Sequence, residues 1–210
     1  MAKMRLFYSP ASPYARKVRV LALEAGLDKK LEMINVALTP VAPNADVDKH
    51  NPVGKIPVLS VKGMDLFDSP VICEYLDSHH KGRKLLARKG RERWVALRQQ
   101  AMADGLLDAA LLVRYEGFLR PEAKRWDDWS KGQMKKIEGV LDQLEAEAKS
   151  LKGKLTLGTI DVGPLLVTGQ RHLLRNIGIG TLTMTGLAHR PKIYDVGTLE
   201  MTGSSAQTRH

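Results

Sequence analysis

The chain has 210 residues, of which 43% are hydrophobic and 27% charged, a composition typical of a soluble globular protein with one large or two small domains. Its single cysteine, Cys73, excludes an intrachain disulfide, a CxxC redox pair and a cysteine-based zinc site. The formal net charge of +10 makes a polyanionic partner one hypothesis to weigh.

No part of the sequence is apolar enough for a membrane span. Such a span needs roughly 18 to 20 consecutive apolar residues. The first ten residues also lack the apolar stretch of a secretory signal. We therefore expect a cytoplasmic protein with no membrane partner.

Strand and helix patterns alternate along the first eighty residues. Short apolar runs bounded by proline, glycine or serine predict strands, and apolar positions at helical spacing predict helices. The predicted elements in chain order are a strand at 4–8, a helix at 14–25, a strand at 32–36, a loop at 38–49, a hairpin of strands at 56–61 and 64–68, and a helix at 69–79. Ser69 is the expected N-cap of the last helix, with Pro70 at its first position. This order predicts a compact α/β unit.

Two long helices are predicted in the second half. Residues 81–90 are basic and polar, as is typical of a linker between domains. Apolar residues then recur three or four positions apart over 91–118 and 129–151, and the apolar face of the first helix begins at Trp94. The predicted division is an α/β domain at 1–80, a linker at 81–90 and an all-α domain at 91–210.

A serine stands where the first strand has ended and the first helix begins. A helix N-terminus stabilises an anion, because its free N–H groups carry a partial positive charge. The hydroxyl of Ser12 at that place can donate a hydrogen bond to a thiolate and help to lower the pKa of the thiol. The alternatives are that Ser12 only caps the helix, or that Ser9 has this role instead.

A proline precedes the third predicted strand, in the sequence NPVGKIPVL at 51–59. Proline at the start of a strand is tolerated only where its missing N–H is not needed. A cis bond between Ile56 and Pro57 would expose the Ile56 backbone to pair with an incoming peptide as an added strand. A trans bond is the alternative, since spacing alone does not fix the isomer.

Asp68 and Ser69 stand at a junction between a strand and a helix. The carboxylate of Asp68 can accept an ammonium group, and Ser69 with its backbone N–H can hold a carboxylate at the start of the helix. An ordinary helix cap is the alternative for this pair.

These motifs, in this order and spacing, resemble the thioredoxin-fold domain of bacterial cytosolic glutathione transferases. The matching segments are SPYARKVR at 12–19, NPVGKIPVL at 51–59 and DSPVICEYL at 68–76, followed by ADGLLDAA at 103–110 and IEGVLDQLE at 137–145 in the helical part. The resemblance covers about residues 4–155. It implies an α/β thioredoxin-like domain followed by an all-α helical domain.

The resemblance also implies a reaction. Ser12 would steady the glutathione thiolate, and Ile56, ahead of a cis Pro57, would pair its backbone with the cysteinyl unit. The thiolate would then attack a small electrophile, whose identity the sequence does not reveal. Serine at position 12, where other members have cysteine, suits thiol–disulfide exchange poorly, and Cys73 is expected to be buried in a helix.

Further residues would hold the rest of glutathione. By the same resemblance, Asp68 and Ser69 would bind the γ-glutamyl ammonium and carboxylate. Lys55 is placed to approach the glycine carboxylate, and His50 is a further candidate for that contact. No metal ion is implied, and glutathione is the co-substrate.

The sequence after about residue 158 departs from the family. Residues 151–210 hold 7 basic but only 3 acidic side chains, together with nine glycines. The capping motif that should open a central helix has its nearest match at Thr159 and Asp161, with the acid one position early. Pro164 then falls inside that helix, at a cost of about 3 kcal/mol. We hypothesise a frameshift or a divergent terminus, which would reduce the stability of the helical domain.

Three functions are compared. The leading one is a homodimeric glutathione transferase with a role in detoxification, whose subunits meet through the helices at 69–79 and 91–118. The alternative is a non-catalytic glutathione-binding or regulatory protein on the same fold. Nucleic-acid binding through the basic run at 81–93 is disfavoured, because no helix-turn-helix, RRM or zinc motif accompanies it.

Overall fold

The structure is a computed structural model that describes residues 4–151 and 155–167. Its first part is a four-stranded sheet in the order β2-β1-β3-β4, in which β1 and β2 are parallel and the other neighbours antiparallel. The strands are β1 (Met4–Tyr8), β2 (Leu31–Asn35), β3 (Val58–Val61) and β4 (Met64–Leu66). The predicted hairpin is confirmed, and Lys62 and Gly63 at its turn both have positive φ, at 51° and 75°.

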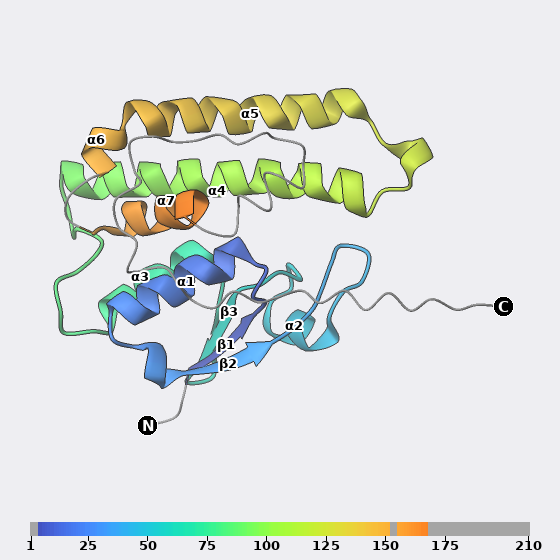
Figure 1. The fold of residues 1–210 in the computed structure, drawn as a ribbon. Coiled ribbons are helices and arrows are strands. Elements are labelled where there is room, and N and C mark those ends of the chain that lie inside the picture. Colours follow the sequence, from blue (N-terminus) through green and yellow to red (C-terminus); the bar gives the residue numbers. More distant parts are fainter. Residues whose placement is uncertain (1–3, 152–154, 168–210) are drawn as a thin grey trace.

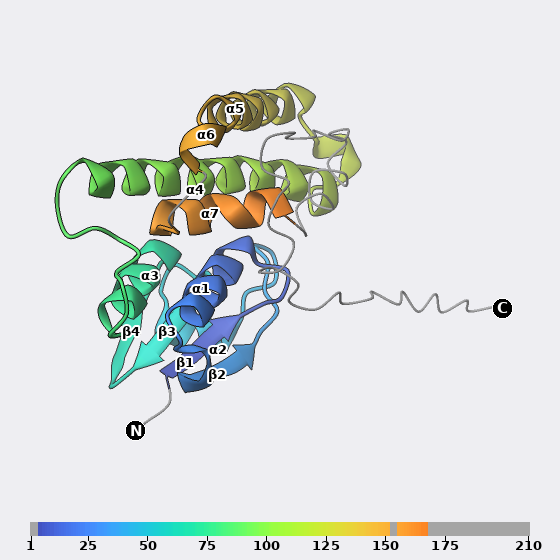
Figure 2. The same cartoon turned by 60° about the vertical axis from the view of Figure 1, so that its left-hand side comes forward.

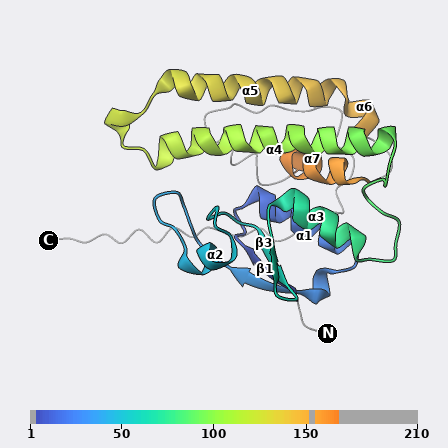
Figure 3. The ribbon, with the colours of Figure 1, turned by 180° about the vertical axis from the view of Figure 1, so that it is seen from behind.

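Helices cover both faces of the sheet and form a second layer above it (Figure 1). The helices are α1 (Pro13–Glu24), α2 (Ala45–His50), α3 (Ser69–Ser78), α4 (Arg91–Phe118), α5 (Asp127–Ala146), α6 (Ala148–Leu151) and α7 (Leu157–Val167), with short 3-10 turns η1 (Asp28–Lys30) and η2 (Glu122–Lys124). Seen from behind, α1 and α3 lie between the sheet and the long helices, while α2 lies beside the sheet and away from them (Figure 3). This is the expected α/β unit followed by helices.

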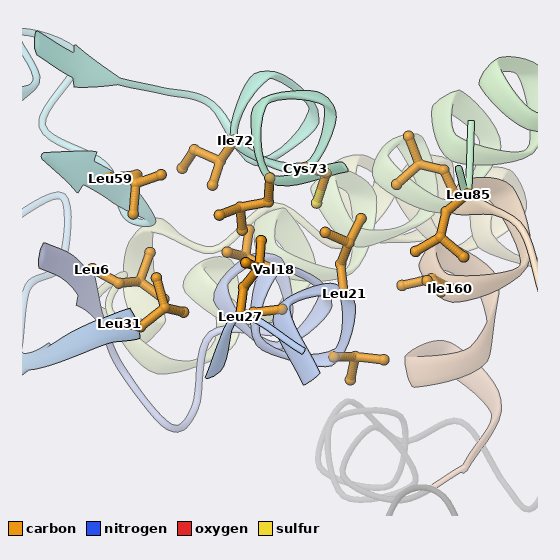
Figure 4. Close-up of a cluster of buried hydrophobic side chains, with 14 of the residues drawn as sticks. Leu6, Val18, Leu21, Leu27, Leu31, Leu59, Ile72, Cys73, Leu85 and Ile160 are labelled. Carbon is orange, nitrogen blue, oxygen red and sulfur yellow. The ribbon is translucent and has the colours of Figure 1, made fainter. Parts of the chain in front are cut away.

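The core of the α/β part consists of two clusters, one on each face of the sheet. Leu6 and Leu59 point toward α1 and α3, while Phe7 and Val58 pack against Val47 of α2. Alternation follows because successive side chains of a strand point to opposite faces. In Figure 4, Cys73 of α3 lies inside the first of these clusters, as predicted.

The long helices α4 and α5 pack side by side, and α7 lies between α4 and α1 (Figure 2). Leu106 and Ala110 of α4 are buried against Ile137 and Leu144 of α5, with Val162 of α7 in the same cluster. Helix α7 also reaches into the first core, where Ile160 lies near Leu85 and Leu21 (Figure 4). It therefore joins the α/β part to the helical part.

Several predicted boundaries differ from the observed ones. The strand at 4–8 and the helix at 91–118 are confirmed, but α5 ends at Ala146 and the short α6 follows it. The N-cap of α3 is Asp68 and not Ser69, which is the first helical residue. Trp94, placed on the apolar face of α4 by its spacing, is 67% exposed, so that end of the predicted face is wrong.

Helix α7 begins three residues earlier than its sequence suggests, because its N-cap is Thr156 and not Thr159. Thr156 and Thr159 cap it reciprocally: the Thr159 N–H donates to Oγ1 of Thr156 at 3.2 Å, and the Thr156 N–H donates to Oγ1 of Thr159 at 2.8 Å. Thr159 thus takes the place of the acid in a capping box, and matching Asp161 to that acid was wrong. The helix continues through Pro164 to Val167. The glycine-rich tail, and with it our hypothesis of a frameshift, lies mostly outside the described residues.

The basic segment before α4 makes contacts within the molecule. Lys84 donates from Nζ to the carbonyl oxygens of Asp77 at 2.6 Å and His80 at 2.7 Å, at the end of α3. Arg83 donates to the carbonyl oxygen of Leu155 at 2.6 Å. These cations satisfy carbonyl groups of the chain itself, which further disfavours a nucleic-acid surface here. The domain limits at 80 and 91 remain predictions.

None of the helices in the described ranges is long and apolar enough to cross a membrane.

Candidate functional site

Ser12 is the N-cap of α1. Its backbone is extended, and its Oγ accepts a hydrogen bond from the Ala15 N–H at 3.2 Å, with Pro13 following at the first helical position. A hydroxyl that accepts in this way keeps its own proton to donate. The cap is therefore compatible with the proposed contact with a thiolate, which stays a prediction.

Ser9 lies just before this turn. Its Oγ accepts from the Ala11 N–H at 3.4 Å, and its carbonyl oxygen accepts from the Ser12 N–H at 3.0 Å. Ser9 is thus engaged in shaping the turn that brings Ser12 to the helix start. Ser9 does not cap α1. The residue at the N-terminus of this helix, where an anion is stabilised, is Ser12.

The loop before β3 is organised by a residue that the sequence analysis did not single out. Asn51 is buried and donates from Nδ2 to the Lys55 carbonyl oxygen at 2.8 Å, while its Oδ1 accepts from the Val53 N–H at 3.0 Å. The Ile56–Pro57 bond that follows is cis, as the first of our alternatives predicted. Asparagine ahead of proline in NPVG was the available signal, since Asn side chains commonly bond to nearby backbone groups.

Ile56 and Lys55 stand at the edge of this loop. The β1–β3 ladder begins with Phe7 opposite Val58, so the Ile56 backbone lies ahead of the ladder. Lys55 is exposed. This arrangement leaves main-chain groups and a cation beside the start of β3, as the proposed peptide pairing needs.

Asp68 caps α3 through its backbone alone. Its side chain makes no capping hydrogen bond and is exposed, whereas Ser69 behind it is buried. The carboxylate is therefore not used by the helix, so the cap that the Asp68 backbone forms is compatible with the predicted contact with an ammonium group. The pair lies at the N-terminus of α3, where a bound carboxylate would be favoured.

His50 is held on the far side of the loop. Its Nδ1 lies 2.9 Å from Oδ2 of Asp65, and its ring packs on Phe7 with centroids 4.7 Å apart. Phe7 belongs to the cluster on the α2 face of the sheet. Only Nε2 of His50 is left for a ligand, so its proposed contact with the glycine carboxylate is less favoured than that of Lys55.

Two pairs of side chains join α1 to α4, and the sequence analysis missed both. Tyr14 donates from its hydroxyl to Asp108, and Lys17 donates from Nζ to Asp104 at 2.6 Å. Burial, followed by the hydrogen bond to Asp108, raises the pKa of Tyr14. These contacts hold the helix that begins at Ser12 against the helical part.

Cys73 does not take part in this site. It is fully buried, and burial raises the pKa of its thiol well above the ordinary value. A protonated, buried thiol is not a nucleophile. Within the described ranges, no group of three or more His, Cys, Asp or Glu residues is placed to hold a metal ion.

A thioredoxin-like sheet, a serine capping α1, a cis proline ahead of β3 and a following helical part define the class of glutathione transferase-like proteins. The comparisons agree with this class. The family model for the N-terminal domain of glutathione S-transferases matches residues 11–79. The uncharacterised GST-like protein YibF of Escherichia coli K12 is 34% identical over 166 residues, 78% of each chain. The chain therefore belongs to the glutathione S-transferase family.

Solved structures with bound glutathione are similar to this chain. A glutathione transferase family member from Pseudomonas fluorescens Pf-5, with glutathione bound, is 42% identical with a TM-score of 0.79, covering 84% of both chains. A glutathione S-transferase from Methylobacillus flagellatus KT, also with glutathione bound, is 38% identical with a TM-score of 0.70, covering 78% of this chain and 81% of the other.

Proposed function

We propose that this protein is a glutathione transferase that conjugates the glutathione thiolate to a small electrophile. The observation that carries the proposal is the similarity to a glutathione-bound family member at 42% identity over 84% of the chain. The geometry at the start of α1 supports it, since Ser12 can both cap the helix and donate to a thiolate. Detoxification is the role that such an activity would serve.

The proposed chemistry is activation of the thiol. The hydroxyl of Ser12 and the N-terminus of α1 stabilise the thiolate, which lowers the pKa of the glutathione thiol and raises the fraction of nucleophile at neutral pH. Ile56 holds the cysteinyl unit through its backbone, while Asp68 and Ser69 hold the γ-glutamyl end. Lys55 and, less favoured, His50 approach the glycine carboxylate. A thiolate positioned in this way attacks the electrophile as an effectively unimolecular step.

Two serine variants test the assignment. Retention of the full chain on immobilised glutathione, followed by a conjugation assay with a generic aromatic electrophile, measures binding and turnover separately. Ser12→Ala should lower kcat by roughly 10- to 100-fold while retention persists, because the thiolate is stabilised mainly in the reacting state. Ser9→Ala should leave kcat within about twofold. If kcat falls in Ser9→Ala but not in Ser12→Ala, the residue that stabilises the thiolate is Ser9.

The same assay separates the enzyme from the non-catalytic alternative. A protein that binds glutathione without turning over any electrophile, and whose binding is the same in Ser12→Ala, would be a binding or regulatory protein on this fold. A wild-type chain that is folded but not retained at millimolar glutathione would contradict both.

We propose a cytoplasmic homodimer as the working form. Two exposed apolar side chains support the interface expected between subunits, Val71 on α3 and Trp94 on α4. Light scattering after size-exclusion chromatography should give twice the chain mass of 23.3 kDa. Trp94→Ser should shift the protein toward the monomer, whereas Trp126→Ser, at an exposed tryptophan beyond η2, should not. A wild-type monomer at all concentrations would refute the dimer.

A further inference from the structure

A buried group of charges lies between α1, α4 and α7. Lys17 of α1 is 1% exposed, and its Nζ lies 2.6 Å from Oδ1 of Asp104 on α4 and 3.7 Å from Oδ1 of Asp161 on α7. Asp161 is 2% exposed, while the side chain of Asp104 is 21% exposed. We call these three residues the Lys17 cluster.

The Lys17 cluster has one more carboxyl group than it has cations. Both oxygens of Asp161 and the side-chain nitrogen of Gln100 are buried without a hydrogen-bond partner among the described residues. Burial raises the pKa of Asp161 to about 7, with Lys17 opposing it. Burial likewise raises the pKa of Asp104, whereas for Lys17 the two carboxylates outweigh burial and raise its pKa. Lys17 therefore stays protonated, whereas Asp161 changes charge near neutral pH.

Among the residues that the structure describes, no second cation is a main influence on the cluster. The groups that affect it are the Cys73 thiol from α3, Asp68 from the junction before α3, and Asp108 from α4. The thiol is protonated, and the two carboxylates add negative charge. Above neutral pH the Lys17 cluster is thus net negative, with its cation on α1, the helix that Ser12 caps, and its two carboxylates on α4 and α7.

We propose that the Lys17 cluster is a positioning and charge-setting element of the glutathione site: Lys17 fixes α1 against the helical domain and favours the bound thiolate, and ionised Asp161 opposes it. This inference rests on the proposed function. Lys17 lies five residues after Ser12, a rise of about 8 Å along the helix. Unit charges about 10 Å apart at an effective dielectric constant of about 20 shift each other's ionisation by about one pH unit.

The glutathione residues themselves stay outside this cluster. The proposed binding residues all belong to residues 12–69, whereas two members of the cluster, Asp104 and Asp161, come from the helical part. Changes in the cluster should therefore alter the ionisation of bound glutathione more than its affinity. If the cluster had only a structural role, substitutions in it would change the stability of the protein. They would not shift the pKa of the bound thiol in opposite directions for the loss of a positive and of a negative charge.

The test is a titration of the thiol of reduced glutathione bound to the full chain, followed by the ultraviolet absorbance of the thiolate. In the wild type, the thiol and Asp161 ionise as a coupled pair, so the transition is broad. Asp161→Asn keeps the shape and removes the charge, and should give a narrower transition at a lower pH, by up to about one unit. Lys17→Met should move the midpoint up by about the same amount.

Two exposed residues provide matched controls. Asp142→Asn on α5 and Lys29→Met in η1 remove the same charges at exposed positions and should leave the midpoint unchanged. Opposite shifts in Asp161→Asn and Lys17→Met, with glutathione affinity within about threefold of wild type, support the proposal. If Lys17→Met does not fold, the result for Asp161→Asn decides alone. A thiol titration in Asp161→Asn that is the same as in the wild type overturns the proposal. Absence of glutathione binding by the wild type would instead overturn the proposed function.

Discussion

Asp161 carries a carboxyl group that the fold prefers to keep protonated. Burial raises its pKa to about 7, against about 3.9 for an aspartate in an unfolded chain. The folded state therefore binds more protons than the unfolded state between these values, and stability falls as the pH rises from about 4 to about 7. Above that range the cost of the buried charge is present in full.

Replacing Asp161 by asparagine should remove this cost. Asp161→Asn should increase the free energy of unfolding by about 1 to 4 kcal/mol at pH 8 and change it little at pH 4. Thermal unfolding at a series of pH values measures this difference. The exposed Asp142→Asn should show no such pH-dependent gain. A destabilised Asp161→Asn at pH 8 would mean that its ion pair with Lys17 outweighs its burial.

Gly158 is needed because α7 begins very close to α4. A methyl group built at this position would lie 2.8 Å from the carbonyl oxygen of Ala96 and 2.9 Å from its Cα, which are backbone atoms that cannot move independently. Gly158→Ala should therefore cost about 1 to 3 kcal/mol of stability. Chemical denaturation measures the loss.

Gly139 in α5 is the matched control for Gly158. A methyl group there would meet nothing within 4 Å. Gly139→Ala should stabilise by up to about 1 kcal/mol, because alanine is the better helix former. Equal effects of the two substitutions would contradict the close approach of α7 to α4.

At the scale of elements, the turn between α4 and α5 depends on one carboxylate. Glu116 accepts from Nε of Arg120 at 2.7 Å and from the Trp126 N–H at 2.9 Å. The hydrogen bond from Arg120, followed by that from Trp126, lowers the pKa of Glu116. Its stabilisation is therefore present above the unfolded pKa of about 4.3 and is lost as the pH falls.

This turn can be tested by acid titration of a neutral variant. Glu116→Gln should lower the melting temperature by a few degrees at pH 7 and by less at pH 3, because the stabilisation by the wild-type carboxylate is lost as the pH falls through its lowered pKa. The exposed Glu138→Gln on α5 should have no effect at either pH. A loss of equal size at both values would show that packing, and not charge, is responsible.

Elements with strong periodicity were predictable, whereas caps were not. The strand β1 and the helix α4 were predicted with their observed ends because apolar spacing and flanking breakers mark them. The cap of α7 was missed because Thr159 replaces the usual acid, so the local pattern pointed to Asp161. That residue is buried beside Lys17, a partner distant in the chain that local spacing does not reveal.

At the scale of the whole molecule, the candidate site combines residues from short sequence motifs with contacts between residues far apart in the chain. Ser12, the cis Pro57 and Asp68 each belong to a short motif whose chemistry could be predicted from adjacent residues. The contacts of Tyr14 and Lys17 with α4 join residues about 90 positions apart and have no sequence signature. They arise only when the helical part packs on α1, so the sequence could suggest candidate glutathione residues but not the contacts that hold α1 in place.

We propose that the chain binds glutathione at the starts of α1 and α3. Isothermal titration of the full chain with reduced glutathione tests it most directly. We predict a dissociation constant below about 1 mM, weakened at least about tenfold in Asp68→Ala, which loses the partner of the γ-glutamyl ammonium. A folded wild-type chain that gives no binding heat at about 10 mM glutathione, or an Asp68→Ala variant that binds as the wild type does, would contradict it.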